Sequence, residues 1–204
     1  MRTLKLGKSD FVNGKYKQGA LEYDGDVEIK KELGLVSFKY IKIGGQLIAH
    51  KGTGIESETY IQTGRGITTG ADIKAKWGIL SDEGIEAWGS ILAGRDISTE
   101  WHIIAVTDIE AGTNIRVGIS IKAGRDIKAG GYVTAGGSIE ATHNIETDGG
   151  IMAFTHIEAE SISTGLRIFA GLIPWRDPEP YEMEIKCKKL IKGEIAYGNL
   201  IIGE

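Results

Sequence analysis

Four histidines and one cysteine are the residues here that most often carry acid–base, nucleophilic or metal-binding chemistry. They are His50, His102, His143, His156 and Cys187. The histidines show none of the short spacings that metal sites require. An acyltransferase would need one of them as a base at a subunit cleft; the simpler interpretation is that the last three are polar residues of turns. We therefore expect no catalytic residue, no metal site and no cofactor.

The number of cysteines and the distribution of charge indicate in which compartment the protein works and which kind of partner it binds. A single cysteine cannot form an internal disulfide, which favours a reducing, cytoplasmic environment. No apolar leader and no stretch of about 18 apolar residues is present, so we expect neither secretion nor membrane insertion. Residues 1–54 carry a net charge of +4, whereas residues 55–165 carry −8. Because nucleic-acid binders present a basic surface, direct nucleic-acid binding is not expected.

The strongest pattern in the sequence is an aliphatic residue at every sixth position between residues 55 and 157. Two residues after each of them comes a small or β-branched residue, and the residue between is usually polar. This alternation is typical of a strand with one buried face. Glycine, aspartate and asparagine recur at the three remaining positions, as expected of turns. The aliphatic residues are Ile55, Ile61, Ile67, Ile73, Ile79, Ile85, Ile91, Ile97, Ile103, Ile109, Ile115, Ile121, Ile127, Val133, Ile139, Ile145, Ile151 and Ile157.

These hexapeptide repeats predict an all-β fold, a single-stranded β-helix or β-solenoid. A helix is excluded because a period of six places successive isoleucines on different sides of it. Strands of three residues are unstable alone, so each must pair with strands of neighbouring coils. With about three hexads in a coil, residues 18 apart are neighbours, and Lys128 lies between Glu110 and Glu146. At ~4.8 Å per coil, roughly six coils make a rod on the order of 29 Å long.

The period divides the chain into three parts. Residues 1–54 are expected to form an N-terminal cap that grades into the first coil, and residues 55–165 the regular β-helix. Residues 166–204 are expected to form a C-terminal cap with closing strands. All three prolines fall within residues 172–181. Because proline cannot sit in a central strand, this segment is predicted to be a loop that leaves the rod.

Two groups of residues are candidates for binding a partner. The proline-rich loop contains Trp175, Arg176 and Tyr181, residue types that dominate interface energetics. The same loop is equally suited to plug the open end of the rod. The tryptophans of the regular part fall on different sides of a three-sided coil, which argues against one flat patch and leaves binding and plain packing both open. This second group consists of Trp77, Trp88, Trp101, Leu80, Leu92 and Ile104.

Two segments resemble a known group of repeat proteins. Residues 121–131 read IKAGRDIKAGG and residues 137–141 read GSIEA. They resemble the IKAGG/IEAG repeat proteins of bacteriophages and other mobile elements over about residues 55–165. The resemblance implies a β-helical, non-enzymatic protein. Some small phage proteins of unusual fold inhibit bacterial defence systems, and anti-CRISPR proteins are among them.

The expected function is that of a rigid binding scaffold acting through protein–protein interaction. The resemblance implies a bacterial defence complex, of the CRISPR type, as the partner that is blocked sterically in the host cytoplasm. The alternative is a self-assembling structural protein, either a bactofilin-like polymer or a component of a phage particle, and a homo-oligomer is consistent with both. Hexapeptide acyltransferases fit less well, because their small residue comes two positions before the aliphatic one rather than two after.

Overall fold

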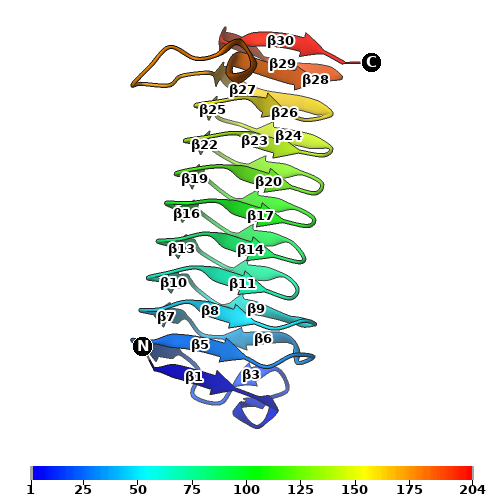
Figure 1. The fold of residues 1–204 in the computed structure, drawn as a ribbon. Helices are drawn as coiled ribbons and strands as arrows, with labels where there is room; N and C mark the ends of the chain where they lie inside the picture. Colours follow the sequence, from blue (N-terminus) through cyan, green and yellow to red (C-terminus); the bar gives the residue numbers. More distant parts are fainter. Residues whose placement is uncertain (1, 204) are drawn as a thin grey trace.

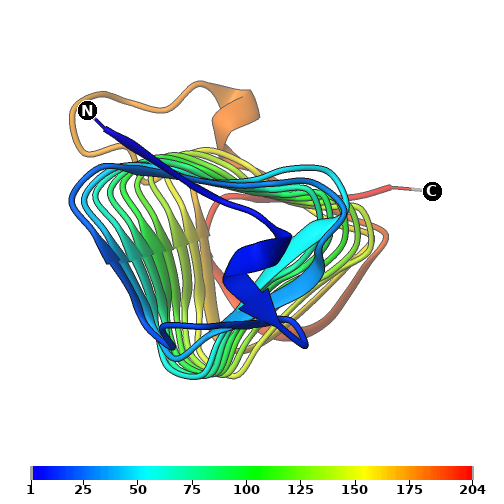
Figure 2. The ribbon, with the colours of Figure 1, turned by 90° about the horizontal axis from the view of Figure 1, so that it is seen from below.

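Each Ile-x-small unit forms one short strand, and the chain turns after it. The computed structural model describes residues 2–203, in which parallel strands stack into a rod of about ten coils (Figure 1). Seen along its axis, the rod has a three-sided cross-section (Figure 2). The sequence-based prediction of an all-β solenoid with three hexads per coil is therefore confirmed.

The three sides are named face A, face B and face C, and the chain visits them in the order C, B, A. Face A contains β1 (Thr3–Leu6), β5 (Asp26–Ile29), β8 (Leu47–Ala49), β11 (Ile67–Thr69), β14 (Ile85–Ala87), β17 (Ile103–Ala105), β20 (Ile121–Ala123), β23 (Ile139–Ala141), β26 (Ile157–Glu158), β28 (Glu184–Cys187) and β30 (Asn199–Ile202). Face B contains β4 (Leu21–Tyr23), β7 (Ile41–Ile43), β10 (Ile61–Thr63), β13 (Ile79–Ser81), β16 (Ile97–Thr99), β19 (Ile115–Val117), β22 (Val133–Ala135) and β25 (Ile151–Ala153).

Face C contains β2 (Phe11–Val12), β3 (Lys15–Tyr16), β6 (Gly34–Phe38), β9 (Thr53–Ser57), β12 (Ile73–Ala75), β15 (Ile91–Ala93), β18 (Ile109–Ala111), β21 (Ile127–Ala129) and β24 (Asn144–Thr147). Two long strands, β27 (Ser161–Ala170) and β29 (Lys189–Tyr197), run across faces C and B without a break. Each corner is named after the faces that it joins, so that residues 100–102 form a B–A corner.

The hydrophobic core consists of vertical columns of isoleucine inside the rod. In the regular part each residue pairs with the residue 18 positions later, so that Ile109 lies against Ile127, and Ile127 against Ile145. All three side chains are fully buried. Burying an isoleucine stabilises a fold by about 1.5–3 kcal/mol, and each column repeats that contribution at every coil. The same spacing places Lys128 beside Glu146, with Nζ 3.8 Å from Oε2.

Stacking extends beyond residues 55–165 in both directions. Residues 20 positions apart pair in the first coils, as Ile41 and Ile61 do, because the early corners are longer. A 3-10 helix η1 (Lys8–Asp10) leads into the β2–β3 hairpin at this end of the rod (Figure 2). The rings of Phe11, Tyr16 and Phe38 pack together there, with centroids 5.2–5.7 Å apart.

The corner glycines are required by close stacking between coils. Gly124 does not have a positive φ. A Cβ at Gly124 would overlap the carbonyl oxygen of Val106, which lies in the coil before it. Glycine at such a corner therefore allows successive turns to lie directly on one another.

Candidate binding surfaces

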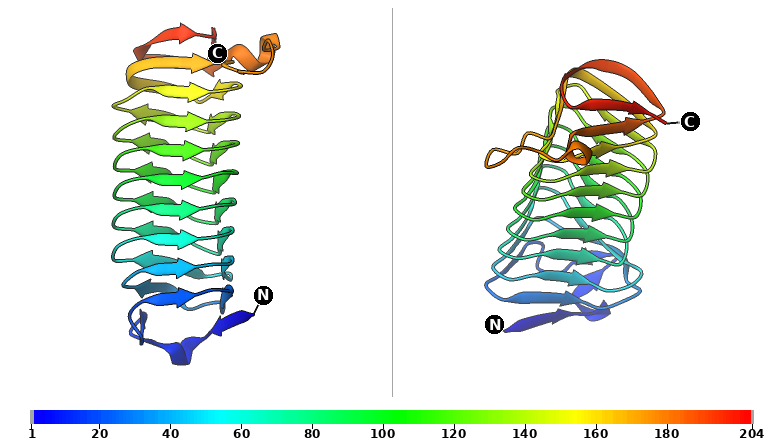
Figure 3. Two further views of the ribbon diagram at one scale, coloured as in Figure 1. Left: turned by 90° about the vertical axis from the view of Figure 1, so that its left-hand side faces the viewer. Right: turned by 45° about the horizontal axis from the view of Figure 1, so that its top comes forward.

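A loop interrupts the stack between β27 and β28, at a B–A corner. It covers residues 171–183 and ends in a second 3-10 helix, η2 (Pro180–Met183). Gly171 begins the excursion with a positive φ of 85°. The loop projects sideways from the triangle and does not cover the open end (Figures 2 and 3). The prediction that this segment leaves the rod is confirmed, and the alternative that it plugs the open end is wrong.

The loop is held in shape by an ion pair between Arg176 and Glu182. The Arg176 guanidinium donates two hydrogen bonds to the carboxylate, from Nη1 to Oε2 at 2.7 Å and from Nη2 to Oε1 at 2.6 Å. The backbone N–H of Glu179 donates a third, at 2.8 Å. These bonds lower the pKa of Glu182, with Arg176 as the largest cause, although burial opposes the shift. The forked geometry uses both carboxylate oxygens and is specific to arginine.

The two aromatic residues of the loop are exposed. Trp175 is 72% exposed and Tyr181 is 60% exposed. The Trp175 ring packs edge-on against Phe154, with centroids 5.9 Å apart. Phe154 belongs to the B–A corner of the preceding coil, so the loop rests against the rod at this point.

Apolar residues continue from the loop along the same corner. Successive turns of the B–A corner stack directly on one another. The backbone N–H of Ile119 donates a hydrogen bond to the carbonyl oxygen of Trp101, one coil earlier. Trp101 is 51% exposed and Ile119 is 50% exposed. Between Ile119 and Phe154 the corner contains only glycine and serine, at positions 136–138. We call Trp101, Ile119, Phe154 and Trp175 the corner strip.

From Trp101 the apolar surface also extends across face A. Ile104 points outward from the middle of β17, and exposed Val106 follows at the A–C corner. Trp88, 74% exposed, lies one coil below Val106 at that corner. The three regular-part tryptophans do lie on three different corners, as the sequence indicated. Trp101 lies at the B–A corner and Trp88 at the A–C corner, so both nevertheless border face A.

The remaining sequence candidates lie elsewhere. Trp77 is on the C–B corner, where the Arg95 guanidinium sits 5.5 Å from its ring centroid. Leu80 is the outward residue of β13 on face B, and Leu92 that of β15 on face C. The structure therefore places Trp101 and Trp175 along the same B–A corner, with Ile104 beside Trp101 on face A, and leaves Trp77, Leu80 and Leu92 on other faces and corners.

Sequence reasoning missed Ile119, Phe154 and Val106. All three are apolar residues at corner positions, where the hexad normally has glycine or a polar residue. A comparison of each corner residue with the repeat average would have singled them out. The grouping of Phe154 with Trp175 also depends on the loop, whose direction the repeat does not determine.

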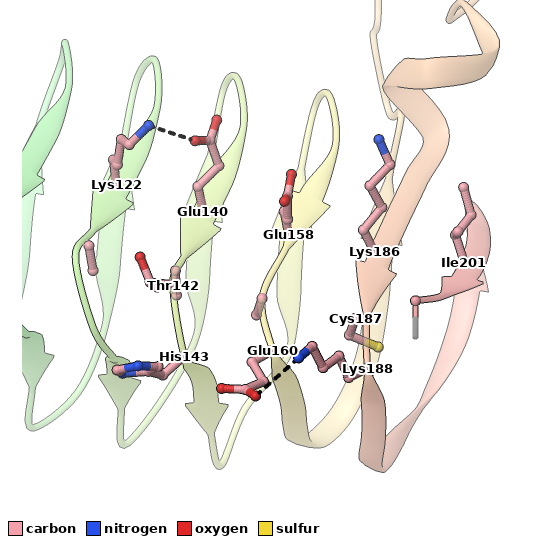
Figure 4. Close-up of a pocket in the computed structure, with 14 residues that line it drawn as sticks. Lys122, Glu140, Thr142, His143, Glu158, Glu160, Lys186, Cys187, Lys188 and Ile201 are labelled. Atoms are coloured by element: carbon pink, nitrogen blue, oxygen red, sulfur yellow. Dashed lines mark ion pairs between the residues drawn. The ribbon is translucent and has the colours of Figure 1, made fainter.

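A shallow groove of about 700 Å³ runs along face A near the C-terminal end (Figure 4). Its floor is the column of small residues that end the strands, including Ala123, Ala141 and Ala159. One wall contains Lys122 and Glu140, whose Nζ and Oε2 atoms are 3.2 Å apart.

Cys187 lies at the end of this groove and is buried (Figure 4). Burial raises the pKa of its thiol, with a hydrogen bond from the Lys189 backbone acting in the opposite direction. A thiol with a raised pKa is mostly protonated at neutral pH and is a weak nucleophile.

Three of the four histidines pair with glutamates that project from face A. His50 Nε2 lies 2.9 Å from Glu28 Oε1, and His102 Nε2 lies 3.0 Å from Glu86 Oε1. His156 pairs in the same way with Glu140, at 3.4 Å. Each pair joins two neighbouring coils. Within residues 2–203, no three His, Cys, Asp or Glu side chains are grouped so that they could hold a metal ion.

Comparisons with known proteins give no family assignment: no family model, curated protein or solved structure matches this chain. Across residues 2–203, no helix has the length and apolar character needed to cross a membrane.

Proposed function

We propose that this chain is a rigid, non-enzymatic binding protein that docks on a protein partner through the 171–183 loop and the corner strip. The observation that carries the proposal is that Trp175 and Tyr181 are both exposed on a loop braced by Arg176 and Glu182. Tryptophan and tyrosine are enriched among the residues that contribute most of the binding energy of an interface. Because the loop is already ordered, binding costs less conformational entropy.

The rod supports this role by its stiffness. Successive coils are joined by parallel strand pairs along all three faces, and the loop is connected to them at both ends. A body of this kind can exclude other molecules from the area beside its contact. We propose a bacterial defence complex of the CRISPR type as the partner, blocked sterically in the bacterial cytoplasm. The IKAGG-like repeats of residues 121–131 support that partner class.

The test is affinity capture of the tagged chain from bacterial lysates with intact defence systems, followed by mass spectrometry. We expect one stoichiometric complex, which the double variant Trp175→Ala/Tyr181→Ala should lose. Tyr132→Ala is the matched control, because Tyr132 is an exposed aromatic residue on the C–B corner. Undiminished capture by the double variant would refute the loop as the binding element, and capture of unrelated proteins only would refute the partner class.

A second candidate function is self-assembly into a bactofilin-like polymer or a phage particle component. It is supported by the exposed aliphatic residues of the last coil, Ile191 on β29 with Leu200 and Ile202 on β30. Strand edges that carry such residues can pair with another chain. Light scattering across a concentration series tests it: steady growth beyond a small oligomer supports a polymer, and a constant mass rejects it.

A further inference from the structure

The corner strip lies between two groups of carboxylates, one near Trp101 and one in the loop. Towards the N-terminus, the B–A corner contains Asp82, Glu83 and Glu100 beside Trp101. Asp82 and Glu100 are exposed. Glu83 forms an ion pair with Arg65, whose Nε lies 3.5 Å from Glu83 Oε1. At the other end, exposed Asp177 and Glu179 lie in the loop beside Trp175. The surface is therefore apolar in the middle and acidic at both ends.

We infer that the partner surface has the complementary pattern, with apolar residues in its centre and a cluster of lysine or arginine at each end. This inference rests on the proposed function and identifies the chemistry of its partner. Opposite charges at the rim of an interface guide association and select the correct partner. Depletion of charge at the centre and polar residues at the rim are the usual layout of an interface.

The spacing of the two acidic groups sets the spacing of the basic clusters. From the corner that contains Asp82 to the start of the loop there are five coil steps, at residues 82, 100, 118, 136, 154 and 171. At ~4.8 Å per coil, these steps amount to roughly 24 Å along the rod axis. An α-helix of about 16 residues has this length.

The positive charges nearby do not cancel the pattern. Arg176 is engaged by Glu182, whose side chain is buried, and Lys122 is paired with Glu140 on face A. The backbone of Gly136 and Gly137 lies between Ile119 and Phe154, so an apolar partner side chain can approach closely there. The apolar centre therefore favours insertion of a side chain, while the acidic ends favour basic neighbours.

Basic clusters are the electrostatic footprint of a nucleic-acid-binding surface, and aromatic side chains between them stack on bases. The proposed steric block would therefore act at a nucleic-acid-binding surface of the partner. The chain would cover a nucleic-acid-binding surface of its partner through charges placed only at the two ends. This differs from mimicry of a uniformly charged duplex, for which the net charge of −8 over residues 55–165 is too small.

The test uses fluorescence anisotropy with a labelled 16-residue helical peptide that has Lys/Arg clusters at both ends and Leu and Phe between them. A peptide with glutamates in place of the basic residues is the control. We expect the basic peptide to bind at least about tenfold more tightly, and its binding to weaken as salt rises. Equal binding of the two peptides, or binding of neither, would overturn the inference.

Charge reversals locate the contact. Asp82→Lys/Glu100→Lys and Asp177→Lys/Glu179→Lys should each weaken binding of the basic peptide by about tenfold. The matched control is Glu110→Lys/Glu146→Lys, which makes the same change of charge on face C. An equal loss in the control would show attraction to net charge alone and would refute the site.

Failure of this inference can be told apart from failure of the proposed function. If Trp175→Ala/Tyr181→Ala abolishes capture of a cellular partner but the charge reversals do not, the loop binds a partner of different chemistry. If neither set of variants affects capture, both proposals fall.

Discussion

Oδ1 of Asp126 accepts two hydrogen bonds from Asn144, one from its backbone N–H at 3.0 Å and one from Nδ2 at 2.8 Å. Asp126 is the residue just before the buried Ile127, and Asn144 occupies the same position one coil later. The side chain at this position thus holds the next coil at its corner. The same contact recurs between Ser90 and Asp72 at 2.9 Å, Asn114 and Asp96 at 3.2 Å, and Tyr132 and Asn114 at 2.9 Å.

Asp126→Ala should destabilise the fold by about 1–2 kcal/mol, because both Asn144 donors lose a partly buried acceptor. The measurement is the free energy of unfolding from urea titration followed by circular dichroism. Arg125→Ala is the control: its exposed side chain makes only a 3.8 Å ion pair with Asp108, so the change should stay below about 0.5 kcal/mol. Equal losses in the two variants would show that the corner hydrogen bonds are unimportant.

The free energy of unfolding should decrease at acid pH, in part because of Asp96. Its pKa is lowered, chiefly by a hydrogen bond from the Thr113 hydroxyl and further by Asn114, with burial opposing the shift. A carboxyl whose folded pKa lies below its unfolded value of about 3.9 stabilises the fold above that value. The contribution is lost as pH falls through the folded pKa.

Asp96→Asn should therefore make the decline of Tm between about pH 5 and pH 2 shallower than in the parent chain. Thermal unfolding at a series of pH values measures it. Glu110→Gln is the control, because it removes an exposed carboxylate of face C that takes no part in the corner hydrogen bonds, and it should change the slope less than Asp96→Asn does. If Asp96→Asn has the same acid slope as the parent, the corner hydrogen bonds do not favour the ionised carboxylate.

The fold could be predicted from the sequence because every hexad places its aliphatic residue in the core, so the same sequence pattern recurs with the same strand and turn. The alternating charges of Glu110, Lys128 and Glu146 favoured the three-hexad coil, and strand register confirms it. The partner of an individual charge was less predictable. Lys74 is a register neighbour of Glu56, yet its Nζ lies 3.1 Å from Asp72, because long exposed side chains can reach several carboxylates.

The candidate site could be predicted only in part. Trp175 and Tyr181 stood out because three prolines cannot belong to a stacked strand. The direction of the loop could not be predicted, because it depends on the contact of Trp175 with Phe154, 21 positions earlier. Ile119 and Phe154 could not be identified as binding residues, because the repeat constrains the residue type strongly at inward positions and only weakly at corners.

Gly124→Ala should destabilise the rod by about 1–3 kcal/mol, as overpacking does in tightly packed interiors. The added methyl group would overlap the carbonyl oxygen of Val106, so two coils must move apart locally. Urea unfolding measures the change. Gly203→Ala is the control, because within residues 2–203 a Cβ at Gly203 would have no heavy atom within 4 Å apart from its chain neighbours. A neutral Gly124→Ala would mean that the corners are not closely stacked.

Arg176→Lys should loosen the 171–183 loop without unfolding the rod. Lysine keeps the charge but cannot donate two parallel hydrogen bonds to the Glu182 carboxylate, so the buried acceptor is satisfied less well. We expect limited proteolysis to cut within the loop several-fold faster, and the midpoint of global unfolding to remain nearly constant. Lys188→Arg is the control, since Lys188 makes a 3.7 Å ion pair with Glu160 on the outer surface. Equal protection of the Arg176→Lys and parent loops would show that Trp175 is held by its contact with Phe154 instead, and the preformed shape of the docking surface would then depend on that ring pair.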